Sequence, residues 1–135
     1  MPRTAHDVTE TELAILQVLW ERRSATRRQI TDVLYPGGDN AHYATVQKLL
    51  ERLEAKGFVR HERPDGVLSF TAALDREQFI SRRLLDMADK LCGGSLTPLL
   101  MNLVRAKPLS VQELEELRAL VEELRPHAKP RGKQR

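Results

Sequence analysis

Apolar residues recur at helical spacing in the first part of the chain, and two of these runs begin at recognisable helix starts. Thr9 with Glu12, and Thr26 with Gln29, have the spacing of a capping box, in which each side chain accepts from the other residue's backbone N–H. The apolar positions that follow are Leu13, Leu16, Leu19, Trp20, Ile30, Val33 and Leu34. The pattern predicts two short amphipathic helices.

A third amphipathic run follows a turn-rich stretch and leads into two short strands. Its apolar positions, spaced i, i+3, i+4 and i+7, are Val46, Leu49, Leu50 and Leu53. Gly57 then suits a helix C′ position, which favours a positive φ. Residues 58–62 and 67–71 are predicted strands around a Pro-Asp-Gly turn at 64–66. Three helices and a hairpin in this order predict a winged helix-turn-helix.

The second half of the chain carries three more helical runs, with longer apolar seams. Asp75 with Gln78 and Ser110 with Glu113 have capping-box spacing, and Ser95 begins the run between them. The seam positions are Ile80, Leu84, Met87, Leu91, Leu99, Leu100, Leu103, Leu114, Leu117, Val121 and Leu124. Because these helices hold too few residues to enclose a core of their own, we expect the seams to be buried against a second copy of the chain.

These patterns predict a mainly α protein with an N-terminal winged helix-turn-helix, made of three helices and a two-stranded wing, and a C-terminal helical dimerisation region. The chain of 135 residues has room for one ordinary domain or two small ones. The expected boundaries are 1–73 for the winged-helix DNA-binding domain, 74–125 for the helical dimerisation domain and 126–135 for a basic, disordered tail.

The net charge of +3 does not by itself favour DNA binding. Residues 1–72 hold equal numbers of basic and acidic residues, and the basic excess lies in residues 125–135. An interpretation as a DNA-binding protein therefore depends on where the charges lie on each element. Projected at 100° per residue, the predicted recognition helix at about 41–56 turns Lys48 and the small Ala44 and Ala55 away from its apolar stripe. Small residues let such a helix approach base edges in the major groove.

The candidate DNA contacts fall into three classes. We expect base readers at Gln47 and Lys48. Phosphate contacts are expected at Thr26, Arg27, Arg28, Tyr43, Thr45 and Arg52. The hairpin tip, with contacts to an adjacent minor groove or its phosphates, would present Arg60, His61 and Arg63. Glu51 either accepts from a cytosine amino group or pairs with a neighbouring cation within the helix.

Several other classes of protein find no support in the sequence. Cys92 is the single cysteine, so it can form neither an internal disulfide nor a cysteine-based metal site, and the four histidines are scattered. No nucleophile-base pair or phosphate loop indicates an enzyme, and nothing indicates a metal or cofactor. No apolar run approaches the length of a membrane span, and the expected location is the cytoplasm. A winged helix used only for protein contact remains an alternative to DNA binding.

Three stretches of the chain resemble a known family, the penicillinase repressors of BlaI and MecI type, within the group that includes the CopY repressors. TETELAILQVLWERRSATRRQITDVL is similar to the family's first two helices, and ATVQKLLERLEAKGFVRHE to its recognition helix and first wing strand. LCGGSLTPLLMNLVRAKPLSVQELEELRALVEEL is similar to its dimerisation helices. The copper-binding cysteine pattern of the CopY branch is absent.

The resemblance implies a dimeric transcriptional repressor with specific partners. These are a double-stranded, two-fold symmetric DNA operator, a second copy of the chain as a homodimer, and a membrane-bound zinc-metalloprotease sensor that releases the repressor by cutting its dimerisation region. In characterised antibiotic-responsive members the cut falls between asparagine and phenylalanine. The matching pair in this chain is Asn102 and Leu103.

Overall fold

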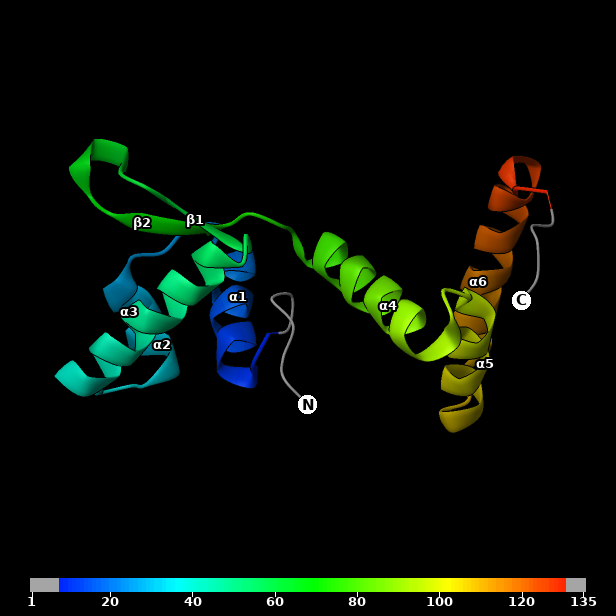
Figure 1. Ribbon diagram of the computed structural model, residues 1–135, viewed down its shortest axis with the longest axis horizontal. Helices are drawn as coiled ribbons and strands as arrows, with labels where there is room; N and C mark the ends of the chain where they lie inside the picture. Colours follow the sequence, from blue (N-terminus) through cyan, green and yellow to red (C-terminus); the bar gives the residue numbers. More distant parts are fainter. Residues whose placement is uncertain (1–7, 131–135) are drawn as a thin grey trace. The chain divides into compact units, whose positions relative to one another are not determined.

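The computed structural model describes residues 8–130 of the chain, which divide between Arg83 and Leu84 into two compact units. The first unit holds three helices, a two-stranded sheet and the beginning of a fourth helix, and Figure 1 shows the hairpin above helices α1–α3 in this view. The elements are α1 (Glu10–Arg22), α2 (Arg27–Leu34), α3 (Asn40–Ala55), β1 (Val59–Glu62), η1 (Pro64–Gly66), β2 (Ser69–Ala72), α4 (Arg76–Cys92), α5 (Leu96–Ala106), α6 (Val111–Leu124) and η2 (Arg125–His127). The predicted winged helix-turn-helix followed by helices is confirmed.

The predicted capping boxes form as expected. Thr9 and Glu12 exchange hydrogen bonds of 2.9 and 3.1 Å, and Thr26 and Gln29 exchange bonds of 2.9 and 3.2 Å. Helix α3 starts at a cap that the sequence pattern did not predict, because Asp39 accepts from the backbone N–H groups of residues 41 and 42. The hydrogen bond from the His42 backbone holds the pKa of Asp39 below its ordinary value.

The wing is an antiparallel hairpin in which β1 and β2 pair from Val59 opposite Ala72 to Glu62 opposite Ser69. Each strand begins one or two residues later than predicted. A short bridge adds a third backbone segment, since Ala25 and Phe70 exchange N–H···O bonds of 3.0 and 2.8 Å. This bridge joins the loop before α2 to the wing, which fixes the hairpin against the helix-turn-helix.

The core of the first unit forms where the helical stripes and the wing meet. The predicted core positions that are buried there are Leu16, Leu19, Ile30, Val46, Leu50 and Phe58. Val33, another apolar position of the second predicted helix, is 43% exposed. In α2, Ile30 and Thr31 are buried, and Leu34, whose position around the helix axis falls between theirs, is half-buried. Val33 lies outside this buried face of the helix. The Thr31 hydroxyl can be buried because it donates to the carbonyl of Arg27 at 2.8 Å.

The first turns of α4 complete this core. Phe79 is 8% exposed, and its ring centroid lies 5.4 Å from that of Trp20 and 5.8 Å from that of Phe58. The Trp20 indole N–H donates to the carbonyl of Leu74 at 2.9 Å. The compact unit therefore extends to Arg83, whereas the boundary expected from the sequence was residue 73.

The second unit contains the rest of α4 and helices α5 and α6. Gly93 and Gly94, both with positive φ, end α4, and Ser110 caps α6 through a reciprocal bond with Glu113. No residue of α5 or α6 is buried in the described chain. The expected basic tail begins in the described residues with η2, while residues 131–135 lie outside them.

Candidate DNA-binding surface

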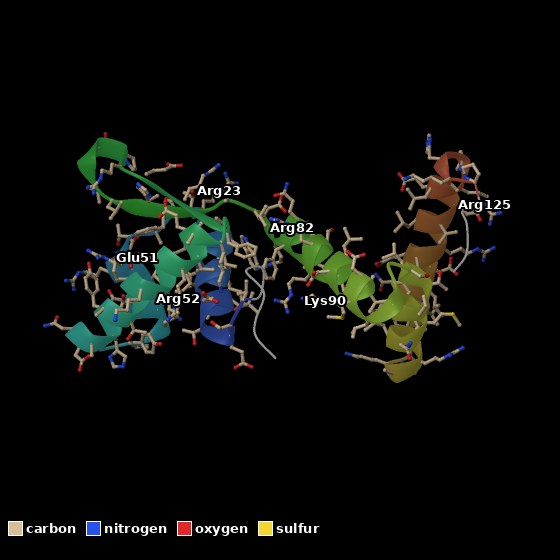
Figure 2. All side chains as sticks on the ribbon, in the orientation of Figure 1. Arg23, Glu51, Arg52, Arg82, Lys90 and Arg125 are labelled. Atoms are coloured by element: carbon tan, nitrogen blue, oxygen red, sulfur yellow. The ribbon has the colours of Figure 1, made fainter. Side chains whose placement is uncertain are left out.

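Helix α3 separates an apolar face from a polar one. Val46, Leu50 and Leu53 are buried, while Lys48 and Arg52 are exposed. The exposed set also contains Glu51, Thr45 and the small residues Ala41, Ala44 and Ala55. Figure 2 labels Glu51 and Arg52 on this helix. A helix of this kind can bring its backbone close to base edges while a few longer side chains reach out.

Arg27 at the start of α2 is held against α3. Its guanidinium carbon lies 4.7 Å from the centre of the Tyr43 ring, and its guanidinium donates a hydrogen bond to Oε1 of Gln47. Arg28 lies 5.6 Å from the same ring but is exposed. Arg27 is half-buried and its guanidinium already donates to Gln47, so Arg28 is the more available of the two for a phosphate contact.

Gln47 is half-buried and uses both ends of its amide. Its Oε1 accepts from Arg27, and its Nε2 donates to Oε2 of Glu51 at 2.6 Å. The neighbouring Lys48 is exposed. The structure therefore places Lys48 outward as expected, while Gln47 is drawn into contacts between α2 and α3 that the sequence did not indicate.

Two threonines on this surface make hydrogen bonds to the backbone of their own helices. The Thr45 hydroxyl donates to the carbonyl of Ala41 at 2.9 Å, and the Thr26 hydroxyl accepts from the backbone N–H of Gln29 at 3.2 Å. The Thr26 hydroxyl can still donate its proton, since capping uses only its oxygen. Thr26 and exposed Arg28 thus lie together where α2 begins, close to Arg27.

The expectation that Arg60, His61 and Arg63 lie together at the hairpin tip is wrong. Arg60 and His61 belong to β1, opposite Thr71 and Phe70, and the tip is the turn Pro64–Gly66. His61 faces α3, where its Nδ1 lies 2.5 Å from Oε2 of Glu54. Side chains alternate across a strand, so Arg60 points to the opposite side of the hairpin. Arg63, which directly precedes the turn, is the member of the set that the tip carries.

A buried ion pair joins the C-terminal end of α3 to α1. Nζ of Lys56, at the end of α3, lies 3.0 and 3.1 Å from the two carboxylate oxygens of Glu12 in α1. Burial raises the pKa of Glu12, but the hydrogen bond from Thr9, together with the hydrogen bond and charge of Lys56, outweighs it and leaves the pKa below its ordinary value. The sequence indicated Glu12 only as a capping residue. Its burial could not be inferred, because Lys56 is distant in the sequence.

The structure adds little support for other kinds of site in residues 8–130. In that range no group of three His, Cys, Asp or Glu side chains has an arrangement that could hold a metal ion. Cys92 is a half-buried free thiol. None of the helices in the same range combines the length and apolar character needed to cross a membrane.

Comparison with known proteins shows the family to which the chain belongs. The family described as "Penicillinase repressor" matches residues 8–123. The penicillinase repressor of Bacillus licheniformis is 24% identical over 116 residues, which cover 86% of this chain and 90% of that protein. The methicillin resistance regulatory protein MecI of Mammaliicoccus sciuri is 21% identical over 121 residues, 90% of this chain and 98% of that protein. A solved structure of a Lactococcus lactis ZitR mutant covers 94% of this chain and 80% of that one, with a TM-score of 0.45 and 16% identity.

The family is one of transcriptional repressors and not of enzymes. Its match covers both compact units, from the start of α1 almost to the end of α6. With a winged helix and an exposed polar face on α3, the chain belongs to the penicillinase repressor family of DNA-binding transcriptional regulators.

Proposed function

We propose that the chain acts as a homodimer that represses transcription by covering a two-fold symmetric DNA operator. Each protomer would place α3 in a major groove, and the wing would contact the flanking backbone. The observation that carries the proposal is the exposure of large apolar side chains along α4, α5 and α6. Every predicted dimerisation residue except Leu99 is exposed in the single chain.

The exposed seams are too apolar to be left in water. Leu117, in the middle of α6, is 45% exposed, and most of the other seam positions are exposed to a similar or greater extent. Burying the exposed half of one leucine stabilises an association by about 1 kcal/mol. Several such residues on each of two protomers can offset the cost of association, roughly 4–15 kcal/mol. A second copy of the chain offers a matching apolar surface, because a two-fold interface uses the same residues from both sides.

The DNA contacts follow from the exposed charges of the first unit. Lys48 is the base reader, because it points outward from the exposed face of α3. Arg52 and Arg28 are also exposed and contact phosphates, as does the hydroxyl of Thr26. Arg63 at the wing tip contacts the flanking DNA. Two half-sites about one helical turn apart are then bound together by the dimer.

The test is retardation of the DNA upstream of the protein's own gene, measured across a series of salt concentrations. Specific retardation at moderate salt supports the repressor. No retardation even at low salt would instead favour a winged helix used for protein contact alone.

Two substitutions on α3 separate the proposed roles. Lys48→Ala should weaken specific binding by roughly 1–3 kcal/mol per half-site and relax the base preference at one position. Arg52→Ala should weaken binding to all DNA sequences alike and flatten the dependence of affinity on salt concentration. Equal effects of the two substitutions in a sequence-scanned binding assay would contradict this assignment.

Release of the repressor would come from cleavage at Asn102–Leu103 by a membrane metalloprotease sensor. Both residues are exposed in α5, and the Asn102 side chain donates to the carbonyl of Pro98 at 2.8 Å within the same helix. A protease binds its substrate as an extended chain, so this helix must open locally before it is cut. A chain ending at Asn102 would lack α6, and we expect it to sediment as a monomer and to lose operator affinity. A chain ending at residue 125 is the control, because it keeps all three helices of the second unit.

A further inference from the structure

An acidic side chain lies on the face of α3 that the proposed function turns toward DNA. Glu51 is exposed, and Figure 2 labels it beside Arg52 on this helix. The other acid of α3, Glu54, is held by His61 of the wing. A carboxylate is repelled by the phosphate backbone, so in a DNA interface it is tolerated where it meets a hydrogen-bond donor. The structure shows how such a carboxylate is held in place.

A chain of hydrogen bonds runs from α2 to Glu51. The Arg27 guanidinium donates to Oε1 of Gln47, and Nε2 of Gln47 donates to Oε2 of Glu51 at 2.6 Å. A guanidinium can only donate and an ionised carboxylate can only accept, so the two ends together fix the orientation of the Gln47 amide. The ring of Tyr43, 4.7 Å from the guanidinium carbon, packs against Arg27. The position of the Glu51 carboxylate is therefore set by residues of two helices.

The contact that positions Glu51 is a hydrogen bond and not an ion pair. The partner of Glu51 is a neutral amide, and no basic side chain lies within ion-pair distance of Glu51 among residues 8–130. Of the two roles open to Glu51 in the sequence, pairing with a cation within the helix is thus not what the structure shows. Gln47 occupies only Oε2 of the carboxylate, which leaves Oε1 to accept a further hydrogen bond.

The major groove offers two kinds of base amino group to such an acceptor. The adenine amino group lies beside the N7 acceptor, so adenine suits an amide that donates and accepts together. Cytosine presents its N4 amino group as a donor, and it suits a carboxylate. We propose that Glu51 determines specificity by selecting cytosine at one position of each half-site, with Arg27 and Gln47 as positioning residues. This inference rests on the proposed function, since it assigns a base to the same surface.

The experiment is a binding assay on the full-length chain in which every base of the operator half-site is varied in turn. For the wild type we expect one position at which cytosine is preferred by roughly tenfold or more. Glu51→Gln keeps the size of the side chain and removes its charge, and we expect it to lose most of that preference while the other positions keep theirs. Glu51→Ala should lose the same preference, and Arg52→Gln is the matched control, with a uniform loss at all positions.

A second variant tests the positioning role. Arg27→Met keeps the aliphatic stem but removes the hydrogen bond to Gln47, so we expect the cytosine preference to fall at the same position and nowhere else. A uniform loss across all sequences would show that Arg27 contacts phosphate instead. Thermal unfolding of each variant separates these effects from a loss of folding.

The outcomes distinguish this inference from the proposed function. If the wild type binds its operator specifically and Glu51→Gln leaves every base preference unchanged, the assignment to Glu51 is overturned while the repressor function stands. If the wild type shows no base preference at all, the proposed function fails and the assignment fails with it.

Discussion

Replacing Lys56 with methionine would remove the cation that faces a buried carboxylate. The Glu12 side chain is fully buried, and that of Lys56 is 20% exposed. Removing one partner of a buried ion pair costs about 3–5 kcal/mol, because the remaining charge is left uncompensated. Thr9 still donates its backbone N–H to Glu12 at 2.9 Å, so we expect a smaller loss, about 2–3 kcal/mol in the free energy of unfolding. For a unit of this size that corresponds to a fall in melting temperature of roughly 10–20 °C.

The pKa of Glu12 sets the sign of the pH dependence. It is lowered from 4.5 in the folded wild type, so Glu12 adds stability that is fully present above its unfolded pKa and is lost as the pH falls through the folded pKa. Burial raises the pKa of Glu12, and without Lys56 less opposes this rise. Glu12 of the folded mutant therefore binds a proton more readily. The difference in stability between wild type and Lys56→Met should therefore be widest near neutral pH and should narrow below about pH 4.5.

Urea unfolding followed by Trp20 fluorescence measures this difference, because the single tryptophan belongs to the first unit. Lys48→Met, which replaces an exposed lysine of α3, is the control and should change the stability little. The double variant Glu12→Gln with Lys56→Met should recover part of the loss, since it buries no charge. A change in Lys56→Met below about 0.5 kcal/mol at neutral pH, or one that does not depend on pH, would refute the reasoning.

Three further predictions test other parts of the chain. Leu117→Glu should separate the proposed dimer at micromolar concentration, because two carboxylates enter the interface, while circular dichroism stays helical; a dimer of wild-type strength in sedimentation would place the interface elsewhere. A fragment of residues 1–83 should unfold cooperatively as a monomer, whereas 1–73 lacks Phe79 and should be less stable by several kcal/mol; equal urea midpoints would contradict the role given to α4. Arg23 has a positive φ of 69° in a γ-turn, which is closed by a 2.8 Å hydrogen bond from the Ser24 N–H to the Arg22 carbonyl. Arg23→Gly should relieve this backbone strain and stabilise the first unit by about 1 kcal/mol, and unchanged stability would argue against strain there.

The sequence predicted the elements of this protein well because their signals are local. Each capping box joins residues three positions apart, and Gly57, with φ of +87°, ends α3 where the stripe stops. The apolar stripes identified about half of the buried core and missed Ile15 and Val18 in α1. The order of helices and strands indicated the winged helix. In the eight residues of α2 the apolar pattern is short, and one of its positions, Val33, is exposed.

The tertiary structure decided every contact between residues distant in the chain. Lys56 reaches Glu12 across 44 positions, the Trp20 indole reaches the Leu74 carbonyl across 54, and Arg27 reaches Gln47 across 20. Periodicity shows which face of a helix is apolar, but it does not show which side chain of another helix will lie opposite a given position. The burial of Glu12, the extent of the first unit into α4, and the hydrogen-bonded chain that ends at Glu51 all depend on that packing, which exists only once the helices have come together.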